Sequence, residues 1–310
     1  MIQDAAFHRI QSTLEYIHNH LDRPLSVESM AEKSCWSRWQ FQRVFSHFTG
    51  QTVAQYIREI RLSRAAELLL CSRRTQLDIA LECGFDSEVS FSRSFRHMFH
   101  CTPGQYRRRG KRAGLKTPIV SLPLTDLSGH KPGGISQLKG LEEHRLLQIR
   151  VESQPEKQVQ GVAGRIQGIF AEQPDFSAKV PQIWQKLSER LAKKHSLTDR
   201  SAMQALGVLD TSSLSSGDTS IDYWACISSD QHEPLTLLDS LVIPEQEYAV
   251  IPFSGPAGLI DNTLQWFICH WLPTSGYRGI NRFDLEVYPS GFIADGQHLE
   301  MEYWVPVAPE

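Results

Sequence analysis

The chain has 310 residues, enough for about two domains of roughly 150 residues each, and its 41% apolar content can supply a hydrophobic core to both. This composition excludes disordered and fibrous classes, and no apolar run approaches the ~20 residues of a membrane span. The net charge of −3 indicates no partner by itself, and the N-terminus lacks the basic and apolar regions of a secretory signal, so we predict a soluble, cytoplasmic protein without a membrane partner.

The charge is distributed unevenly along the chain. Residues 1–112 hold 17 Lys and Arg against 11 Asp and Glu, a net charge of +6, whereas residues 113–310 hold 15 against 24, a net charge of −9. Turn-forming Gly, Pro and Ser residues are dense just after the basic half. We therefore predict a first domain over 1–112, a linker over 113–144 and a second domain over 145–310.

Residues 7–109 are predicted to form closely spaced helices, and they contain an internal repeat. An offset of 50 residues aligns Phe41 with Phe91 and Arg43 with Arg93. The same offset aligns three further pairs: Ser37 with Ser87, Phe45 with Phe95, and Gln55-Tyr56 with Gln105-Tyr106. Two copies of one structural unit are therefore predicted.

Each copy has the pattern of two helices joined by a tight turn. In the first copy, Ser37 caps the second helix with Gln40 at the capping-box spacing, and in the second copy Gly84 permits the turn. Apolar residues at helical spacing predict the buried faces of the second helices: Phe41, Val44, Phe45 and Phe48, and Phe91, Phe95, Met98 and Phe99. This arrangement is a helix-turn-helix, which places its second helix in the major groove of double-stranded DNA.

The outward faces of these helices carry side chains that can recognise bases. Arginine binds guanine O6 and N7 with two hydrogen bonds, and glutamine can pair with adenine. Arg43 and Arg93 hold equivalent positions in the two copies, which favours a role in recognition over a solvated surface. Further basic residues are expected to bind phosphates: Arg61, Arg64, Arg73, Arg74, Arg107, Arg108, Arg109, Lys111 and Arg112.

Several of these motifs resemble the DNA-binding domain of the AraC/XylS family. They are Ile79-Ala80, Gly84-Phe85, Phe91-Ser92-Arg93-Ser94-Phe95 and Thr102-Pro103-Gly104-Gln105-Tyr106-Arg107, and the first copy, Ser37 to Phe45, is similar to the MarA, SoxS and Rob branch. The resemblance implies two helix-turn-helix units joined by a longer helix, about Val53 to Cys71. It also implies activation of stress or drug-efflux genes through contact with RNA polymerase.

The resemblance also implies which residues contact DNA. By matching position, the DNA-binding candidates are Arg38, Trp39, Gln42 and Arg43 in the first copy, and Glu88, Ser90, Ser92, Arg93 and Arg96 in the second. Where the branch tends to carry two Gln residues, this chain has Glu88 and Val89. A carboxylate can accept a hydrogen bond from cytosine N4 but repels phosphate, so the second half-site is expected to differ.

The acidic half is predicted to be an α+β domain. Short alternating stretches predict strands near 146–152, 205–210, 222–228, 247–253, 283–288 and 299–307. Apolar stripes predict helices around Ile183 and Leu264, so the order strand, helix, strand, strand occurs twice. Gly161, Gly164 and Gly168 are interpreted as bulge or turn positions. The predicted fold class is multidomain: an all-α double helix-turn-helix domain followed by an α+β domain of two βαββ pseudo-repeats.

No pattern typical of a catalytic or metal site occurs in the sequence. The six cysteines form no C-x-x-C pair, and the chain has no G-x-S-x-G, H-E-x-x-H, P-loop or G-x-G-x-x-G pattern. We therefore predict free thiols, no metal, no cofactor, no catalytic residue and no enzymatic activity.

Aromatic and acidic residues occur together in the acidic half. They are Trp184, Tyr223, Trp224, Trp266, Trp271, Tyr288, Tyr303 and Trp304, with Asp222, Asp284, Glu286, Glu300 and Glu302. Aromatic faces attract cations, and a carboxylate among them suits an amphipathic organic cation. From periodicity alone, a place in the core or on a solvated sheet face is favoured over a ligand pocket for the same residues.

Residues 145–308, and most clearly those after 240, resemble the GyrI-like effector-binding family. The motifs are Leu241-Val242-Ile243-Pro244, Trp271-Leu272-Pro273-Thr274-Ser275-Gly276-Tyr277, Leu285-Glu286-Val287-Tyr288-Pro289 and Glu302-Tyr303-Trp304-Val305-Pro306. The resemblance implies a groove between two βαββ halves that in several regulators binds hydrophobic cations beside a buried Glu. The ligand-binding candidates are Glu286 as the countercharge, with Trp184, Trp224, Trp266 and Tyr288.

The two resemblances together predict a sequence-specific DNA-binding transcriptional regulator. Its partners are double-stranded promoter DNA, RNA polymerase and a hydrophobic or cationic small-molecule effector sensed by the second domain. Two alternatives stay open for the second domain: a protein-interaction or gyrase-inhibitor-like module, and a weak hydrolase.

Overall fold

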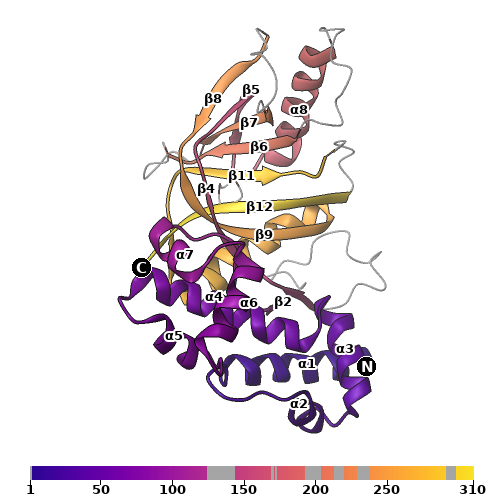
Figure 1. Ribbon diagram of the computed structural model, residues 1–310. Coiled ribbons are helices and arrows are strands. Elements are labelled where there is room, and N and C mark those ends of the chain that lie inside the picture. Colours follow the sequence, from indigo (N-terminus) through magenta and orange to yellow (C-terminus); the bar gives the residue numbers. More distant parts are fainter. Residues whose placement is uncertain are drawn as a thin grey trace. The chain divides into compact units, whose positions relative to one another are not determined.

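The computed structural model describes residues 2–123, 144–168, 171, 173–192, 204–212, 220–228, 237–290 and 298–310. The described residues up to 152 form one compact unit, and those from 153 onward form a second. The first unit is mainly helical and the second is built on a sheet (Figure 1).

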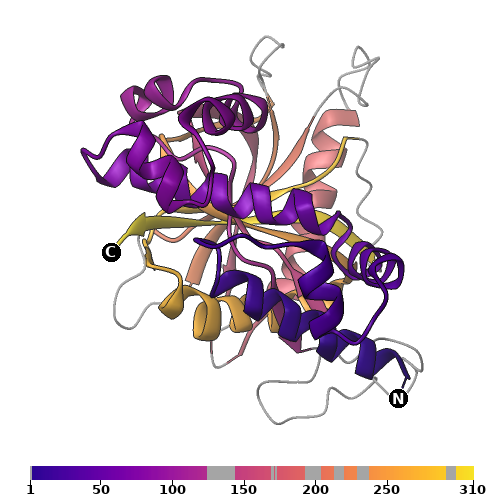
Figure 2. The ribbon, with the colours of Figure 1, turned by 60° about the horizontal axis from the view of Figure 1, so that its bottom comes forward.

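Helices account for most of the first unit. They are α1 (Ile2–His18), α2 (Val27–Lys33), α3 (Arg38–Thr49), α4 (Val53–Cys71), α5 (Gln76–Glu82), α6 (Glu88–Phe99) and α7 (Pro103–Arg109). The helices α1 to α3 lie at one end of the long helix α4, and α5 to α7 lie at its other end (Figure 2). The predicted pair of helix-turn-helix units joined by one longer helix is confirmed.

Side-chain caps explain where these helices begin. Ser37 forms the predicted capping box at the start of α3, where its Oγ accepts the Gln40 N–H and Gln40 Oε1 accepts the Ser37 N–H. Thr102 and Gln105 form a second capping box at α7. Each cap satisfies backbone donors that a helix leaves open and contributes about 1 kcal/mol.

The predicted apolar stripes form the core of each helix-turn-helix. Phe41 and Phe45 are fully buried, as are Phe91 and Phe95 in the second copy. In the turn before α6, Gly84 has a φ of 76°. A Cβ at this position would lie 2.8 Å from the Leu21 carbonyl oxygen, so glycine is required there both for its conformation and for its close packing.

Residues 113–123 are packed against the helices, which differs from the linker predicted there. Ile119 is buried in the core beside Tyr56, and the Tyr56 hydroxyl accepts the Ile119 N–H at 2.9 Å. Turn-forming residues indicated the end of the helices but did not reveal that Leu115, Ile119 and Leu122 would be buried. Residues 124–143 of the predicted linker lie outside the described residues.

Four short strands complete the first unit. They are β1 (Leu115–Lys116), β2 (Val120–Pro123), β3 (His144–Leu147) and β4 (Arg150–Gln154), of which β4 runs into the second unit. β1 pairs with β4 and β2 pairs with β3, both antiparallel. The stretch 146–152, predicted as one strand of the second domain, therefore contributes mainly to the first unit.

The second unit is an antiparallel sheet with two helices. Its elements are β5 (Lys157–Gln167), α8 (Phe176–Ala192), β6 (Ala205–Asp210), β7 (Ser220–Ser228), β8 (Asp239–Ile243), β9 (Gln246–Pro256), α9 (Ile260–Trp266), β10 (Tyr277–Gly279), β11 (Phe283–Val287) and β12 (His298–Pro309). The strand order is β9-β12-β11-β6-β7-β5-β8, and β10 pairs with β12.

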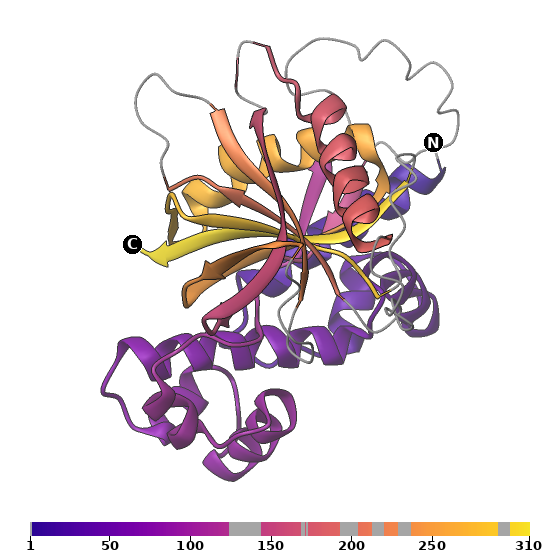
Figure 3. The ribbon, with the colours of Figure 1, turned by 90° about the horizontal axis from the view of Figure 1, so that it is seen from above.

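This order contains the two predicted βαββ halves. One half is β5-α8-β6-β7 and the other is β9-α9-β11-β12, and they join where β11 pairs with β6. Figure 3 shows α8 and the helical segment that contains α9 on the same face of the sheet. That segment continues from α9 into a π-helical turn (Phe267–Trp271) and a 3₁₀ turn (Leu272–Thr274). The predicted α+β fold class is confirmed.

The glycines of β5 correct one prediction. Gly161 and Gly164 lie inside this strand and not at a turn, and β5 takes the place expected for the stretch near residue 146. A Cβ at Gly164 would lie 2.6 Å from Ile183 Cδ1 of α8. These glycines therefore allow neighbouring elements of the same unit, β7 and α8, to pack closely against β5. Close approach of a neighbouring segment is a second role of glycine within a strand, besides forming a bulge.

Candidate functional site

The first candidate DNA-binding surface is the outward face of α3. Arg38, Trp39, Gln42 and Arg43 are all exposed, and Trp39 has 66% of its surface accessible. The Arg43 guanidinium lies 5.2 Å from the centre of the Trp39 ring, a cation–π contact that orders a side chain projecting from the helix. Arg38 forms an ion pair with Glu28 of α2 at 3.0 Å.

The second candidate surface is the outward face of α6. Glu88, Ser90, Arg93 and Arg96 are exposed and Ser92 is half-buried, whereas Phe91 and Phe95 point into the core. Val89, in the first turn, has 79% of its surface accessible, which is unusual for an apolar side chain on a helix. The structure therefore places all nine predicted DNA-binding residues on α3 and α6, the second helices of the two units.

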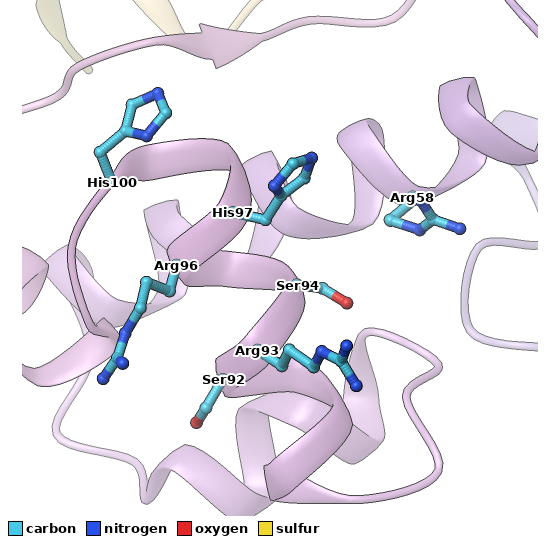
Figure 4. A pocket seen from close by; sticks show the side chains of 7 residues that line it. All are labelled: Arg58, Ser92, Arg93, Ser94, Arg96, His97 and His100. Atoms are coloured by element: carbon cyan, nitrogen blue, oxygen red, sulfur yellow. The ribbon is translucent and has the colours of Figure 1, made fainter.

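A basic hollow of about 770 Å³ lies beside α6. Its lining consists of Arg58 from α4, five residues of α6 (Ser92, Arg93, Ser94, Arg96 and His97) and His100, which caps the C-terminal end of α6. In Figure 4, Arg93, Ser94 and His97 project toward the side on which Arg58 lies, whereas Ser92 and Arg96 project from the other side of α6. No carboxylate belongs to this lining in the part of the chain that the structure describes, so the hollow suits phosphate.

Arg58, His97 and His100 were not among the predicted DNA-binding residues. The internal repeat could not reveal Arg58, because this residue belongs to α4, the helix that joins the two units. Its position near α6 depends on how α4 packs. The two histidines follow the predicted set on α6, and their helical spacing from Arg93 was the available signal.

Several arginines expected to bind phosphates have hydrogen-bond or ion-pair partners within the first unit. Arg61 donates to three backbone carbonyls, those of Leu21 (2.9 Å), Arg23 (2.6 Å) and Gly84 (3.0 Å). Arg107 donates in the same way to the carbonyls of Leu69 and Arg74. Arg64, Arg74 and Arg112 form ion pairs with carboxylates. The structure therefore gives these five residues partners that the charge count could not reveal, and Arg64 and Arg74 are exposed nonetheless.

The second unit contains a cavity of about 600 Å³ between its sheet and its two helices. Most lining side chains are apolar, among them Ile166, Leu209 and Val305 on the strands and Val180 and Leu264 on the helices. The polar lining includes three carboxylates: Asp284 and Glu286 of β11 and Asp261 of α9. Such an enclosure, apolar with a few converging polar groups, is typical of a small-molecule site.

Two tyrosines hold the Glu286 carboxylate in place. Its Oε2 accepts hydrogen bonds from the Tyr223 hydroxyl at 2.6 Å and from the Tyr288 hydroxyl at 2.8 Å. Trp184 Nε1 donates to the Tyr223 oxygen at 2.8 Å, and its ring meets that of Tyr288 edge to face. Burial raises the pKa of Glu286 above its ordinary value, and the two hydroxyl donors oppose this shift.

Gly207 of β6 makes room for this arrangement. It is paired directly with Glu286 across the sheet. A Cβ on Gly207 would lie 2.4 Å from Glu286 Oε2 and 2.6 Å from the Tyr223 hydroxyl. The absence of a side chain at residue 207 is therefore what allows the carboxylate to reach Tyr223.

The two aspartates have perturbed acidities. Burial raises the pKa of Asp284 to about 7, a shift that the nearby Glu286 charge increases and a hydrogen bond from the Tyr303 hydroxyl at 3.1 Å opposes. Burial also raises the pKa of Asp261 to about 6. The Oδ1 atom of Asp261 is buried and has no hydrogen-bond partner within the described ranges.

The predicted ligand-binding residues are only partly brought together. Glu286 lines the cavity. Tyr288 donates a hydrogen bond to Glu286, and Trp184 donates one to Tyr223, but neither Trp184 nor Tyr288 belongs to the lining. Trp224 packs on the opposite face of the sheet, because successive residues of β7 alternate and Tyr223 faces the cavity. Trp266 is buried on α9 but is absent from the cavity lining.

Four residues of the described lining with ionisable side chains are outside the predicted ligand set: Tyr223, Asp261, Asp284 and Tyr303. Tyr223, Asp284 and Tyr303 belong to the group of aromatic and acidic residues that the sequence of the acidic half contains. Period-two alternation with Glu286 was a usable signal for Asp284, since residues two apart on a strand share a face. Asp261 carried no such signal, because it belongs to a different element.

Two family models match the chain. A model described as "Helix-turn-helix domain" matches residues 30–109, and one described as "Integron-associated effector binding protein" matches residues 150–307, about half of the chain. The transcriptional regulator Rob of Salmonella typhimurium is 40% identical over 112 residues, which are 36% of this chain and 39% of Rob. The regulatory protein SoxS of the same organism is 44% identical over 100 residues, 32% of this chain and 94% of SoxS.

The chain belongs to the AraC family of DNA-binding transcriptional regulators. Its second unit is a GyrI-like effector-binding domain, so both predicted resemblances and their order along the chain are confirmed. A solved integron cassette protein of Vibrio cholerae aligns with 52% of this AraC-family chain and 95% of its own, at 19% identity and a TM-score of 0.37.

Two features are absent from the described residues of this AraC-family protein. Across the residues that the structure describes, no group of three or more His, Cys, Asp or Glu side chains is arranged to hold a metal ion. No helix within the same residues is long and apolar enough to cross a membrane.

Proposed function

We propose that this AraC-family protein activates transcription in response to an amphipathic organic cation that binds in the second unit. The observation that carries the proposal is the apolar cavity with the held carboxylate of Glu286 at its floor. A carboxylate in an apolar enclosure is costly until a counterion joins it. An organic cation supplies both the countercharge and an apolar body, so it fits better than a neutral molecule or a metal ion.

The DNA contacts that we propose are those of the two second helices. Arg38, Trp39, Gln42 and Arg43 would enter one major-groove segment, and Glu88, Ser90, Ser92, Arg93 and Arg96 the next. The basic hollow beside α6 would bind the phosphate backbone. Activation through RNA polymerase and a target set of stress or efflux genes rest on the similarity to the MarA, SoxS and Rob branch.

The cation site is tested with tetraphenylphosphonium, a lipophilic cation whose charge does not depend on pH. We expect the Kd of the full chain, measured by calorimetry, to rise about 10-fold or more in Glu286→Gln, because the variant keeps the shape but loses the charge. On a duplex selected from a random-sequence library, the cation should also increase the transcript made by RNA polymerase with the wild-type chain and not with Glu286→Gln.

Glu300→Gln is the matched control, since Glu300 is an exposed residue of β12 outside the cavity lining. It should bind tetraphenylphosphonium like the wild type. Equal Kd values for Glu286→Gln and Glu300→Gln would contradict the assigned countercharge, and a transcript yield that ignores the cation would contradict effector sensing.

Affinity for the same cation should depend on pH. The pKa of Asp284 is about 7 because of burial, so below pH 7 its carboxyl is mainly neutral and must lose a proton to pair with a cation. We expect the affinity to increase from pH 5.5 to pH 8, by up to about 10-fold per unit below pH 7, and then to level off. Asp284→Asn should make this profile less steep and leave the part that is due to Asp261 and Glu286, whose pKa values burial also raises. A Kd that is constant over the range in the wild type would contradict the prediction.

A further inference from the structure

The three carboxylates of the cavity come from different walls. Asp284 and Glu286 belong to β11 and lie on the sheet floor, whereas Asp261 belongs to α9, one of the helices that cover this face. Apolar residues such as Leu264 and Val305 make up much of the lining around them. The cavity therefore presents negative charge on two walls with an apolar interior.

Each of these carboxylates keeps an oxygen atom open to a ligand. Both tyrosine hydroxyls donate to Oε2 of Glu286, and Tyr303 donates to Oδ2 of Asp284. Among the described residues, no hydrogen bond reaches Glu286 Oε1 or Asp284 Oδ1, and the buried Oδ1 of Asp261 is equally without a partner. An unpaired buried acceptor costs free energy that a bound donor recovers.

No basic side chain balances these charges. The cavity lining that the structure describes contains no Lys, Arg or His. A single cation placed at Glu286 would leave Asp261 uncompensated on the helical wall. Two cationic groups carried by one apolar body would neutralise both walls in a single binding event.

We propose that the effector is an amphipathic dication, with one cationic group at Glu286 and Asp284 and the other at Asp261. This inference rests on the proposed function and specifies the class of ligand. The length of the ligand's apolar body then becomes a determinant of specificity, because it must match the separation between the two charged walls.

The test compares 1,8-diaminooctane with octylamine, which has the same carbon chain and one amine. Calorimetry on the full chain at pH 7.5 should show the diamine binding about 10-fold more tightly. Asp261→Asn should abolish this advantage, because it weakens binding of the diamine about 10-fold more than binding of octylamine. The octylamine binding that is retained also verifies that the variant is folded. Glu286→Gln should weaken binding of both amines.

The outcomes separate this inference from the proposed function. If the two amines bind equally to the wild type, or if Asp261→Asn weakens both to the same extent, the dication inference is overturned while a cation site stands. If neither these amines nor tetraphenylphosphonium bind, the cation site itself is overturned and the inference with it.

Discussion

Replacing either Arg43 or Arg93 with alanine should weaken binding to a selected DNA site by about 1–3 kcal/mol, roughly 5- to 150-fold. Both side chains are exposed on the outward faces of α3 and α6, at equivalent positions of the internal repeat. An arginine that binds a guanine edge leaves the base's acceptors unpaired when it is removed. The double variant should lose about the sum, since the two helices are separate elements.

Fluorescence anisotropy with labelled duplexes measures these effects at a fixed salt concentration. Arg278→Ala is a suitable control because Arg278 is exposed on β10 in the other unit, and its affinity should match that of the wild type. A scrambled duplex separates base recognition from phosphate binding, since a phosphate contact would weaken binding to both duplexes alike. Unchanged affinity in both single variants would refute the assignment of α3 and α6 as recognition helices.

The helical unit could be predicted closely because its determinants are local. The capping box of Ser37 and Gln40 and the Phe41 and Phe45 stripe depend on residues within one or two helical turns, and the structure confirms them. The 50-residue repeat then carried the same logic to α6. The sequence did not predict which residue each charged side chain contacts. The Arg61 side chain is of a type that binds phosphate, but in the structure it donates hydrogen bonds to backbone carbonyls that are distant in the sequence. Those bonds depend on tertiary packing.

The cavity shows the limit of sequence reasoning more sharply. Glu286 could be singled out because it is the charged residue of a motif, but its partners come from other strands. Trp224 and Tyr223 are adjacent in the sequence and face opposite sides of the sheet, so abundance of aromatic residues could not show which one lines the cavity. Register and helix placement decide such questions, and neither is encoded locally.

Gly207→Ala should damage the cavity although Gly207 itself is not one of the residues that line it. The new methyl group would lie 2.4 Å from Glu286 Oε2 and 2.6 Å from the Tyr223 hydroxyl, so at least one of them must move. Either movement breaks the hydrogen bond between them, and Tyr223 is also held by Trp184. We expect a loss of about 1–3 kcal/mol in stability and a Kd for tetraphenylphosphonium raised about 10-fold or more.

Gly255→Ala is a matched control, because it makes the same glycine-to-alanine change at a position where a methyl group fits. Gly255 lies in β9 of the same sheet, and a Cβ there would meet only Phe253 Cζ, at an ordinary distance of 3.7 Å. Differential scanning calorimetry of both full-length variants, followed by tetraphenylphosphonium titration, compares them directly. If Gly207→Ala melts and binds like Gly255→Ala, the glycine does not hold the carboxylate in place, and the network around Glu286 does not depend on the close approach of β6.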